Sequence, residues 1–356
     1  MDRLRILYFI TSHGYGHAVR TASICNRFPP GTEVTFITDI PERFFQEEVS
    51  VSFNVVSWSF DCGCVQLDGV TVDREATLRR YIEIAQRNRE SKERVLSFCR
   101  ENRFDVIVSD IVPFAFEIAK ELSIPCAAVC NFTWYDIYKE YTGTHLWFID
   151  ELENMREQYS YADIHIELRP AFKSGCFRRR ESLSYIGDRG RDLSHEIRSY
   201  FGINQDERLA LLYTGGYGMN YVNWKGMERL RGWHFLGLNR LEYEPVNFHY
   251  MDKGIFDYRD LFPSSDAVIS KPGYSTCVRC ILNNTPMVYI PRRDFAEYQV
   301  LERELDDWGG GVRMPIEDFK NLSWIEYLNA AAELQPSHNG AEDSRRAAET
   351  IEGLSR

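Results

Sequence analysis

The sequence lacks any long hydrophobic run. Among its 356 residues, no apolar stretch approaches the roughly 20 residues that a membrane-spanning helix needs. The N-terminus, MDRLRILYFITS, carries charge at once and passes into a strand-like run, so we expect neither a signal peptide nor a membrane span. Short repeats and low-complexity tracts are also absent. With 44% hydrophobic and 27% charged residues, the composition is typical of a globular protein in water.

Paired cysteines and excess positive charge are lacking as well. The nine cysteines are an odd number and lie mostly in apolar segments, which favours a reducing compartment over a disulfide framework. We therefore expect a cytoplasmic protein. The pairs Cys62/Cys64 and Cys277/Cys280 fall in different halves of the chain, so we predict no zinc site. A net charge of −11 argues against a nucleic-acid partner.

The length and the pattern of apolar residues favour two α/β domains. Short β-rich runs alternate with amphipathic stretches, which indicates β-α units and parallel sheets. The alternation breaks at about residue 167, in a segment rich in arginine, glycine and serine where we place the linker, and it restarts at about residue 209. We predict two Rossmann-like domains, residues 1–166 and 167–340, and a C-terminal helix, residues 341–356, which could pack back on the first domain.

The clearest predicted strands divide evenly between the two halves. They are residues 5–11, 33–38, 105–109 and 126–131 in the first half, and 209–213, 234–238, 267–270 and 287–290 in the second. The longest helix is expected at residues 77–102, where apolar residues recur on one face.

A glycine-rich loop, residues 12–17 (SHGYGH), directly follows the first predicted strand. Ligands of doubly wound sheets bind beyond the carboxyl ends of the strands, so we expect a site here. Gly14 and Gly16 allow backbone to approach a ligand closely. His17 suits a general base acting near neutral pH. The alternative is a turn whose histidines cap the next helix or bond to backbone.

Asp110 stands at the end of another predicted strand, just before Pro113. A carboxylate at that edge of the sheet can orient a histidine from a neighbouring loop and stabilise its positive charge. Asp is also a common helix N-cap, and the two roles are compatible.

Two more glycine turns follow strands in the second half, at residues 214–218 (TGGYG) and 270–276 (SKPGYST). Exposed backbone N–H groups and the dipole of a helix N-terminus suit a diphosphate. Ser275 and Thr276 can donate to phosphate oxygens, and Lys271 adds charge. In the segment 292–299 (RRDFAEYQ), carboxylates and an amide could bind sugar hydroxyls. Each segment alone could equally be an ordinary turn or a charged loop.

Together these segments resemble the GT-B glycosyltransferases, and most closely the glycosyltransferase-like region that precedes the sugar kinase in plant L-arabinokinases. A more distant likeness is to the peptidoglycan N-acetylglucosaminyltransferase and to small-molecule glucosyltransferases. The resemblance covers nearly the whole chain. It rests on TSHGYGHAVR (11–20), DCGCVQ (61–66), TVDR (71–74), VSDIVP (108–113), NFTW (131–134), KPGYST (271–276), RRD (292–294) and GGV (310–312).

The resemblance implies an inverting, metal-independent glycosyltransferase without a cofactor. Its donor would be a nucleotide diphosphate sugar, expected to be a UDP-sugar, and its acceptor a small molecule or glycan. By the resemblance His17 is the candidate base, Asp110 its partner and His13 a second candidate base. The residues expected around the donor are Gly14, Gly16, Gly215, Gly216, Lys271, Gly273, Tyr274, Ser275, Thr276, Asp294, Glu297 and Gln299.

One position departs from the pattern of the relatives. Many of them carry a glutamate after the SKPGYST-type turn, where it accepts hydrogen bonds from the ribose, whereas this chain has Arg279. A cation cannot accept those bonds, so either the ribose is held otherwise or the nucleotide differs. Two other functions therefore stay open, a non-catalytic sugar-sensing module and a nucleotide-sugar hydrolase or epimerase on the same fold. An acceptor could stack on aromatic residues of the first half, namely Trp58, Phe60, Trp134, Tyr135 and Tyr138.

Overall fold

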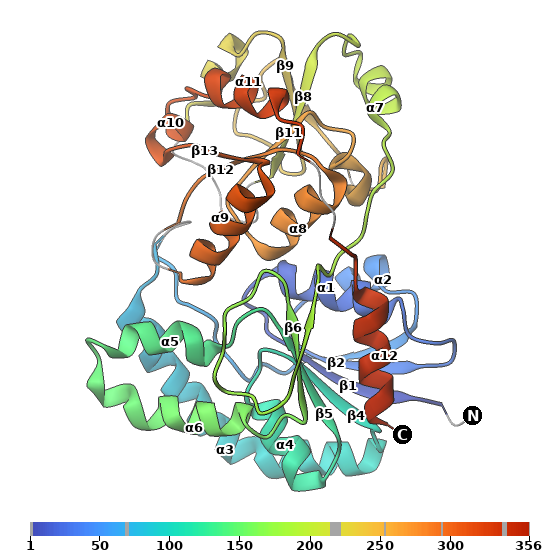
Figure 1. Cartoon of the computed structure of the whole chain (residues 1–356), viewed down its shortest axis with the longest axis vertical. Helices are drawn as coiled ribbons and strands as arrows, with labels where there is room; N and C mark the ends of the chain where they lie inside the picture. Colours follow the sequence, from blue (N-terminus) through green and yellow to red (C-terminus); the bar gives the residue numbers. More distant parts are fainter. Residues whose placement is uncertain are drawn as a thin grey trace. The chain divides into compact units, whose positions relative to one another are not determined.

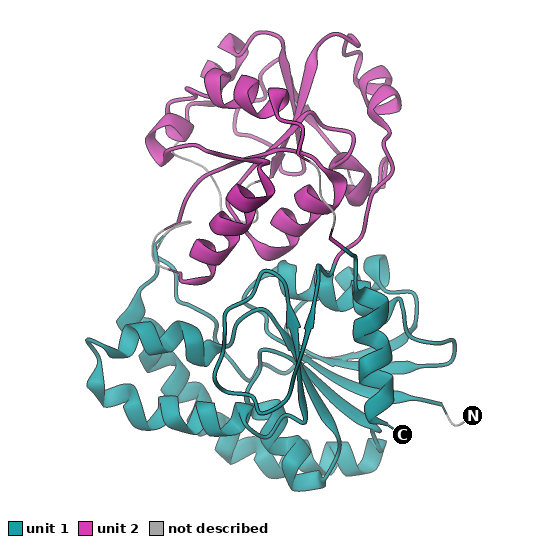
Figure 2. Ribbon diagram, viewed as in Figure 1, with its two compact units in different colours: residues 1–67, 71–186, 341–356 teal, residues 68–70, 187–340 magenta. Residues whose placement is uncertain are grey.

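The computed structural model describes residues 3–67, 71–213, 222–252, 254–292, 295–336 and 340–355. The chain forms two compact units (Figure 2). Unit 1 comprises Met1–Leu67, Thr71–Ile186 and Ala341–Arg356, and unit 2 is built mainly from Gly187–Gly340. Within the described ranges, no helix has both the length and the apolar character needed to cross a membrane.

Unit 1 is organised around a seven-stranded parallel sheet with the order β3-β2-β1-β4-β5-β6-β7 (Figure 1). The central strands are buried along nearly their whole length, as expected when helices cover both faces of a sheet. The strands are β1 (Arg5–Ile10), β2 (Glu33–Ile37), β3 (Ser52–Val56), β4 (Val106–Asp110), β5 (Cys126–Cys130), β6 (Ile164–Leu168) and β7 (Arg180–Leu183).

The helices of unit 1 form two groups. One contains α1 (Tyr15–Cys25), α2 (Glu42–Glu48) and α12 (Ser344–Leu354), with α1 in contact with both of the others. The other contains α3 (Arg74–Asn102), α4 (Phe114–Leu122), α5 (Trp134–Thr142), the short η1 (Leu146–Phe148) and α6 (Ile149–Tyr159). Because the strand order reverses between β1 and β4, right-handed crossovers place the two groups on opposite faces of the sheet.

The boundary between the units follows Ile186, whereas the sequence pattern placed it after residue 166. Both β6 and β7 pair in the first sheet, so the predicted linker segment contains a strand. The strand β7 reads RESL, a short polar edge strand that lacks the apolar signal used to find strands. The C-terminal helix α12 packs on α1 and β4, and Tyr185 pairs with Glu342 beside it.

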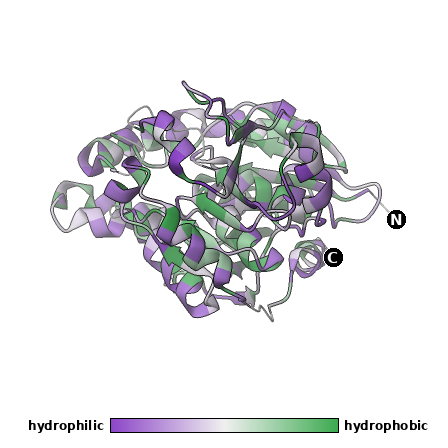
Figure 3. Cartoon of the chain, turned by 90° about the horizontal axis from the view of Figure 1, so that it is seen from above, coloured by the Kyte–Doolittle hydropathy of each residue, from purple (hydrophilic) through white to green (hydrophobic). Residues whose placement is uncertain are grey.

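Unit 2 contains a six-stranded parallel sheet with the order β10-β9-β8-β11-β12-β13. Its strands are β8 (Arg208–Tyr213), β9 (Trp233–Gly237), β10 (Phe248–Tyr250), β11 (Ala267–Ser270), β12 (Met287–Tyr289) and β13 (Gly311–Arg313). Its helical elements are α7 (Ser194–Phe201), η2 (Trp224–Arg229), η3 (Tyr258–Leu261), α8 (Tyr274–Asn283), α9 (Glu297–Trp308), α10 (Ile316–Lys320) and α11 (Ile325–Glu333). In Figure 3 the helices alternate between hydrophobic and hydrophilic residues, the pattern of helices with one face on a core.

Each sheet has one point where the chain order reverses, between β1 and β4 and between β8 and β11. Ile10 pairs with Asp110 in the first sheet, and Tyr213 pairs with Ser270 in the second. The loops that follow β1 and β4 therefore begin next to each other in the first sheet, as do the loops that follow β8 and β11 in the second. Such reversal points are where open α/β sheets bind ligands, and the four main predicted motifs follow these four strands.

Candidate functional site

A buried polar cluster lies where β1 and β4 end. His17 is in the first turn of α1, and Asp110 is the last residue of β4. Nδ1 of His17 lies 2.8 Å from Oδ1 of Asp110. The Asp110 side chain is fully buried, and His17 is 9% exposed. The structure thus brings together the two residues that the sequence analysis paired.

Arg20 is a third member of the cluster that the sequence analysis did not select. It lies one turn after His17 on α1 and is only 1% exposed. Its Nε donates to Oδ2 of Asp110 at 2.6 Å, its Nη2 donates to Oδ1, and its Nη1 donates to Oδ1 of Asn131 at 2.6 Å. The signal available in the sequence was the spacing of His17 and Arg20, since residues three apart share a helix face.

The charges in this cluster decide where the proton of His17 resides. Burial alone would raise the pKa of Asp110, but the charges and hydrogen bonds of Arg20 and His17 outweigh burial and lower it. An ionised carboxylate only accepts hydrogen bonds, so we assign the proton of neutral His17 to Nδ1. Arg20 Nη2 also lies 2.8 Å from Nδ1, but Nδ1–H has no lone pair to offer it. The lone pair of His17 is therefore on Nε2.

His13 has the opposite arrangement. Its Nδ1 accepts a hydrogen bond from the backbone N–H of Cys64 at 3.2 Å, so in the neutral ring the proton is on Nε2. The imidazole also packs edge-on against Trp134, with ring centroids 5.3 Å apart. Neutral His13 therefore presents a donor at Nε2, whereas His17 presents an acceptor. This difference favours His17 as the base.

Asp61 is a second buried carboxylate near His17, in the loop after β3. Its Oδ2 accepts a hydrogen bond from Nε1 of Trp134 at 2.7 Å. Burial raises the pKa of Asp61 to about 6, even though the bonds from Trp134 and Thr11 act in the other direction.

Three of the aromatic residues considered for the acceptor, Trp134, Phe60 and Tyr138, are buried in the core of unit 1. The burial of these three rings favours a role in the core over stacking on an acceptor.

The two glycines of the first loop lie at the beginning of α1. Gly14 is the N-cap residue, with an extended backbone and no side-chain cap, and Gly16 is in the first turn. A Cβ at Gly14 would meet no described atom within 4 Å. Gly14 is thus not required by packing inside unit 1, and the space beside it is open to a ligand.

The anion site predicted in unit 2 centres on the start of α8. Lys271 and Gly273 connect β11 to this helix, and Gly273 is its N-cap residue without a side-chain cap. A Cβ at Gly273 would also meet no described atom within 4 Å. Tyr274, Ser275 and Thr276 form the first turn. The structure therefore gathers five of the predicted donor residues at one helix N-terminus, where the dipole favours an anion.

Two cations accompany this helix start. Burial, and then the positive charge of Arg292, lower the pKa of Lys271 to about 7. Arg292 is 7% exposed, and its Nη1 donates to the hydroxyl of Tyr298. Its buried Nε has no hydrogen-bond partner among the described residues. An anion bound here would favour the charged form of Lys271 against the effects of burial and of Arg292, so the pair is suited to a negatively charged ligand.

Two further predicted donor residues lie on different sides of one helix. Glu297 and Gln299 both lie in the first turn of α9, but Glu297 is buried and Gln299 is exposed, because residues two apart face different sides of a helix. Gly215, Gly216 and Asp294 lie outside the described residues.

Arg279, the departure from the relatives, packs inside unit 2. It is 2% exposed, and its guanidinium carbon lies 4.9 Å from the ring centroid of Tyr258 and 5.7 Å from that of Phe262. The side chain thus contacts aromatic rings of the unit instead of presenting an acceptor for ribose hydroxyls.

The cysteines form no disulfide bonds. All nine are free, and Cys277 and Cys280 are buried in α8, as expected for core-facing residues. Within the part of the chain that the structure describes, no group of three His, Cys, Asp or Glu side chains could hold a metal ion.

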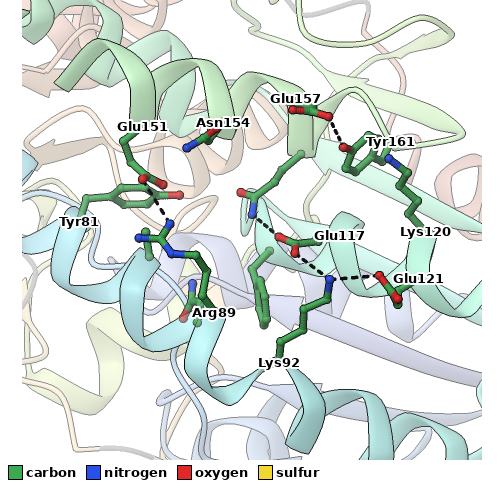
Figure 4. Close-up of a pocket in the computed structure, with 14 residues that line it drawn as sticks. Tyr81, Arg89, Lys92, Glu117, Lys120, Glu121, Glu151, Asn154, Glu157 and Tyr161 are labelled. Atoms are coloured by element: carbon green, nitrogen blue, oxygen red, sulfur yellow. Dashed lines mark hydrogen bonds and ion pairs between the residues drawn. The ribbon is translucent and has the colours of Figure 1, made fainter.

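A separate polar pocket of about 590 Å³ lies among α3, α4 and α6, and no predicted site residue lines it. Several of its charges are paired: Lys92 lies 3.1 Å from both Glu117 and Glu121, and Arg89 lies 3.4 Å from Glu151 (Figure 4). A pocket with internally paired charges gives no direct indication of a ligand.

Comparison with known proteins supports the fold. No family model matches the chain. L-arabinokinase of Arabidopsis thaliana is 30% identical over 341 residues, which are 94% of this chain and 32% of that protein. The chain thus spans about a third of the length of this relative.

Solved glycosyltransferase structures share the architecture of the chain. A UDP-glucosyltransferase from Polygonum tinctorium matches with a TM-score of 0.63 at 13% identity, covering 99% of both chains. The spinosyn forosaminyltransferase SpnP matches at 0.62 and 13%, covering 99% of this chain and 95% of the other. MurG of Acinetobacter baumannii matches at 0.55 and 11%, covering 98% and 99%. The predicted resemblances are confirmed, and the chain has the GT-B fold of these glycosyltransferases.

Proposed function

We propose that the chain is a glycosyltransferase that moves a sugar from a UDP-sugar or another nucleotide diphosphate sugar to an acceptor hydroxyl. The observation that carries the proposal is the buried contact between His17 and Asp110 at the reversal point of the first sheet. The sugar-transferring enzymes among the proteins of the same fold support it. The helix N-terminus of α8, with Lys271 and Arg292 beside it, supports a diphosphate on the donor.

In the proposed reaction, Nε2 of His17 removes the proton of the acceptor hydroxyl. The acceptor oxygen forms a bond to the anomeric carbon while the bond from that carbon to the diphosphate oxygen breaks, so the configuration inverts. Asp110 stabilises the imidazolium that results. Lys271, Arg292 and the N–H groups at the start of α8 would stabilise the charge on the leaving diphosphate without a metal ion.

The test begins with thermal shifts of the purified chain in UDP, GDP, ADP and TDP and in their sugar conjugates, because ligands that bind the folded state raise Tm. Release of nucleotide diphosphate is then measured for each donor that binds, with and without a panel of phenolic, sugar and lipid acceptors. Release that needs an acceptor supports the transferase. Release without one indicates a hydrolase instead, and binding without release indicates a sensing module.

The first prediction concerns the base. His17→Ala should lower transfer by about 10²- to 10⁴-fold, the usual contribution of a general base, while donor affinity stays close to that of the unchanged protein. His13→Gln is the matched control, because neutral His13 presents only a donor and the amide keeps one. We expect it to retain most activity. Transfer that survives in His17→Ala would refute the base assignment.

A non-catalytic sugar-sensing module is the second candidate function, and the position of Arg279 favours it. The place where many relatives hold the ribose is taken by a cation packed on Tyr258 and Phe262. This candidate predicts donor binding that is insensitive to His17→Ala and no release of nucleotide diphosphate with any acceptor.

A further inference from the structure

Arg20 is the buried charge that the proposed reaction leaves without a role. Its guanidinium donates hydrogen bonds to both oxygens of Asp110, a geometry that fixes the carboxylate in one orientation. Asn131, at the end of β5, holds the third nitrogen. Arg20 therefore ties α1 to the ends of two strands around the carboxylate that orients His17.

The net charge of the cluster is zero while His17 is neutral, since Arg20 balances Asp110. In a histidine–aspartate pair without such a cation, the carboxylate favours the imidazolium, because protonation creates a compensated ion pair. Here the carboxylate is already compensated. A proton on His17 would therefore gain little compensation from Asp110.

The other titratable groups around His17 are present whether or not Arg20 is. Asp61 faces His17 from the loop after β3, and burial raises the pKa of that carboxyl to about 6, so near pH 7 it is mostly ionised and adds a negative charge that is the same with and without Arg20. Burial also raises the pKa of Tyr8 on β1 and of Cys130 on β5, so both stay neutral. His13, from the loop after β1, has Nδ1 bound to the N–H of Cys64. Among the described residues, Arg20 is the buried cation that bonds to Asp110.

We propose that Arg20 is a positioning residue that keeps His17 in its unprotonated, base-competent form by neutralising Asp110 in advance. The catalytic part of this inference rests on the proposed function, in which His17 is the base. The effect of Arg20 on the protonation of His17 can be measured without turnover. After His17 accepts the proton of the acceptor hydroxyl, the neighbouring positive charge of Arg20 favours loss of that proton to solvent, which restores the base.

The experiment compares Arg20→Met, Arg20→Lys and the double variant Arg20→Met/Asp110→Asn. In Arg20→Met, Asp110 faces His17 alone, so the acid limb of the pH profile of kcat/KM should move upward by about one unit or more, with about a tenfold loss near pH 7 that is recovered near pH 9. Arg20→Lys keeps the positive charge but cannot donate to both oxygens of Asp110 in the same way. We therefore expect kcat to fall while the acid limb of the pH profile stays in place. The double variant is again uncharged, and its limb should return toward that of the unchanged protein.

A merely structural role would lower activity equally at every pH and would leave the limb in place in all three variants, which would overturn the inference. The double variant also tests whether Arg20→Met merely misfolds. It lacks the buried carboxylate that Arg20→Met leaves unpaired, so return of its acid limb toward that of the unchanged protein attributes the shift to charge.

The inference and the proposed function can fail separately. Absence of transfer in the unchanged protein would refute the proposed function. The charge balance is then judged by NMR titration of the labelled His17 ring. The midpoint should be higher in Arg20→Met than in the unchanged protein, and equal midpoints would refute the role of Arg20.

Discussion

At the scale of single residues, His13 and His17 show how neighbours assign different chemistry to the same side chain. A backbone N–H takes the Nδ1 lone pair of His13, and a carboxylate takes the Nδ1 proton of His17. The sequence predicted both histidines and Asp110 because glycine loops and strand ends have recognisable local patterns. It did not predict Arg20, because the partner of that side chain is distant along the chain and only the fold brings them together.

Lys271 provides the second residue-scale prediction. Its pKa in the free protein is lowered to about 7, so above that pH the amine is largely neutral. A bound diphosphate favours the charged amine and raises its pKa. Affinity is therefore full below about pH 7 and should fall by up to about tenfold per unit as the pH rises above it, because binding then requires uptake of a proton.

Calorimetric titration of UDP between about pH 6.5 and 8.5, in buffers of different ionisation enthalpy, measures both the affinity and the proton uptake. Lys271→Gln should bind more weakly with a flatter pH profile. Lys320→Gln, at a more exposed lysine of the same unit, is the control and should behave like the unchanged protein. An unaltered profile in Lys271→Gln would contradict the assignment.

At the scale of elements, strand ends and central strands were predictable because their apolar runs are strong signals. The edge strand β7 was not, since a polar edge strand looks like a loop in sequence. The loop after β3 was also unpredictable in its role. Two hydrogen bonds hold this loop against α5: Trp134 Nε1 donates to Asp61 at 2.7 Å, and the Tyr138 hydroxyl donates to the carbonyl of Gly63 at 2.6 Å. The loop therefore lies beside His13.

Gly63 tests this docked loop. It has a φ of +60°, and a Cβ there would overlap the imidazole of His13. Gly63→Ala should therefore lower the free energy of unfolding by about 2 kcal/mol or more, measured by urea denaturation. Gly31 has a φ of +92° and open space around it. If backbone strain alone mattered, Gly31→Ala would lower the free energy of unfolding more than Gly63→Ala. A larger decrease for Gly31→Ala would therefore refute the predicted overlap with His13.

At the scale of the whole molecule, the two-sheet architecture followed from the repeated strand-helix alternation, and the site motifs followed from the reversal points of the two sheets. The sequence predicted a C-terminal helix that could pack back on the first domain, and the structure places this segment in unit 1. Unit 1 is completed by α12, where Ala347, Ala348 and Ile351 are fully buried. Asp343 adds a hydrogen bond to the backbone N–H of Ser184 at 2.7 Å.

This completion of unit 1 leads to a prediction for stability. Ile351→Ala should lower the free energy of unfolding by about 2–5 kcal/mol, because it removes buried methyl groups from the contact of α12 with the rest of unit 1. Glu349→Ala, on the exposed side of the same helix, should have little effect. Equal urea midpoints for the two variants would show that α12 does not stabilise unit 1.

The insertion of unit 2 between the two segments of unit 1 also determines an order of assembly during translation. The ribosome releases the last residues of unit 2 before it releases α12. The second unit is thus able to fold while the first still exposes the surface of α1 and β4 that α12 covers. We therefore expect the unit that begins synthesis first to be completed last, and nascent chains paused before residue 344 to present that surface to chaperones.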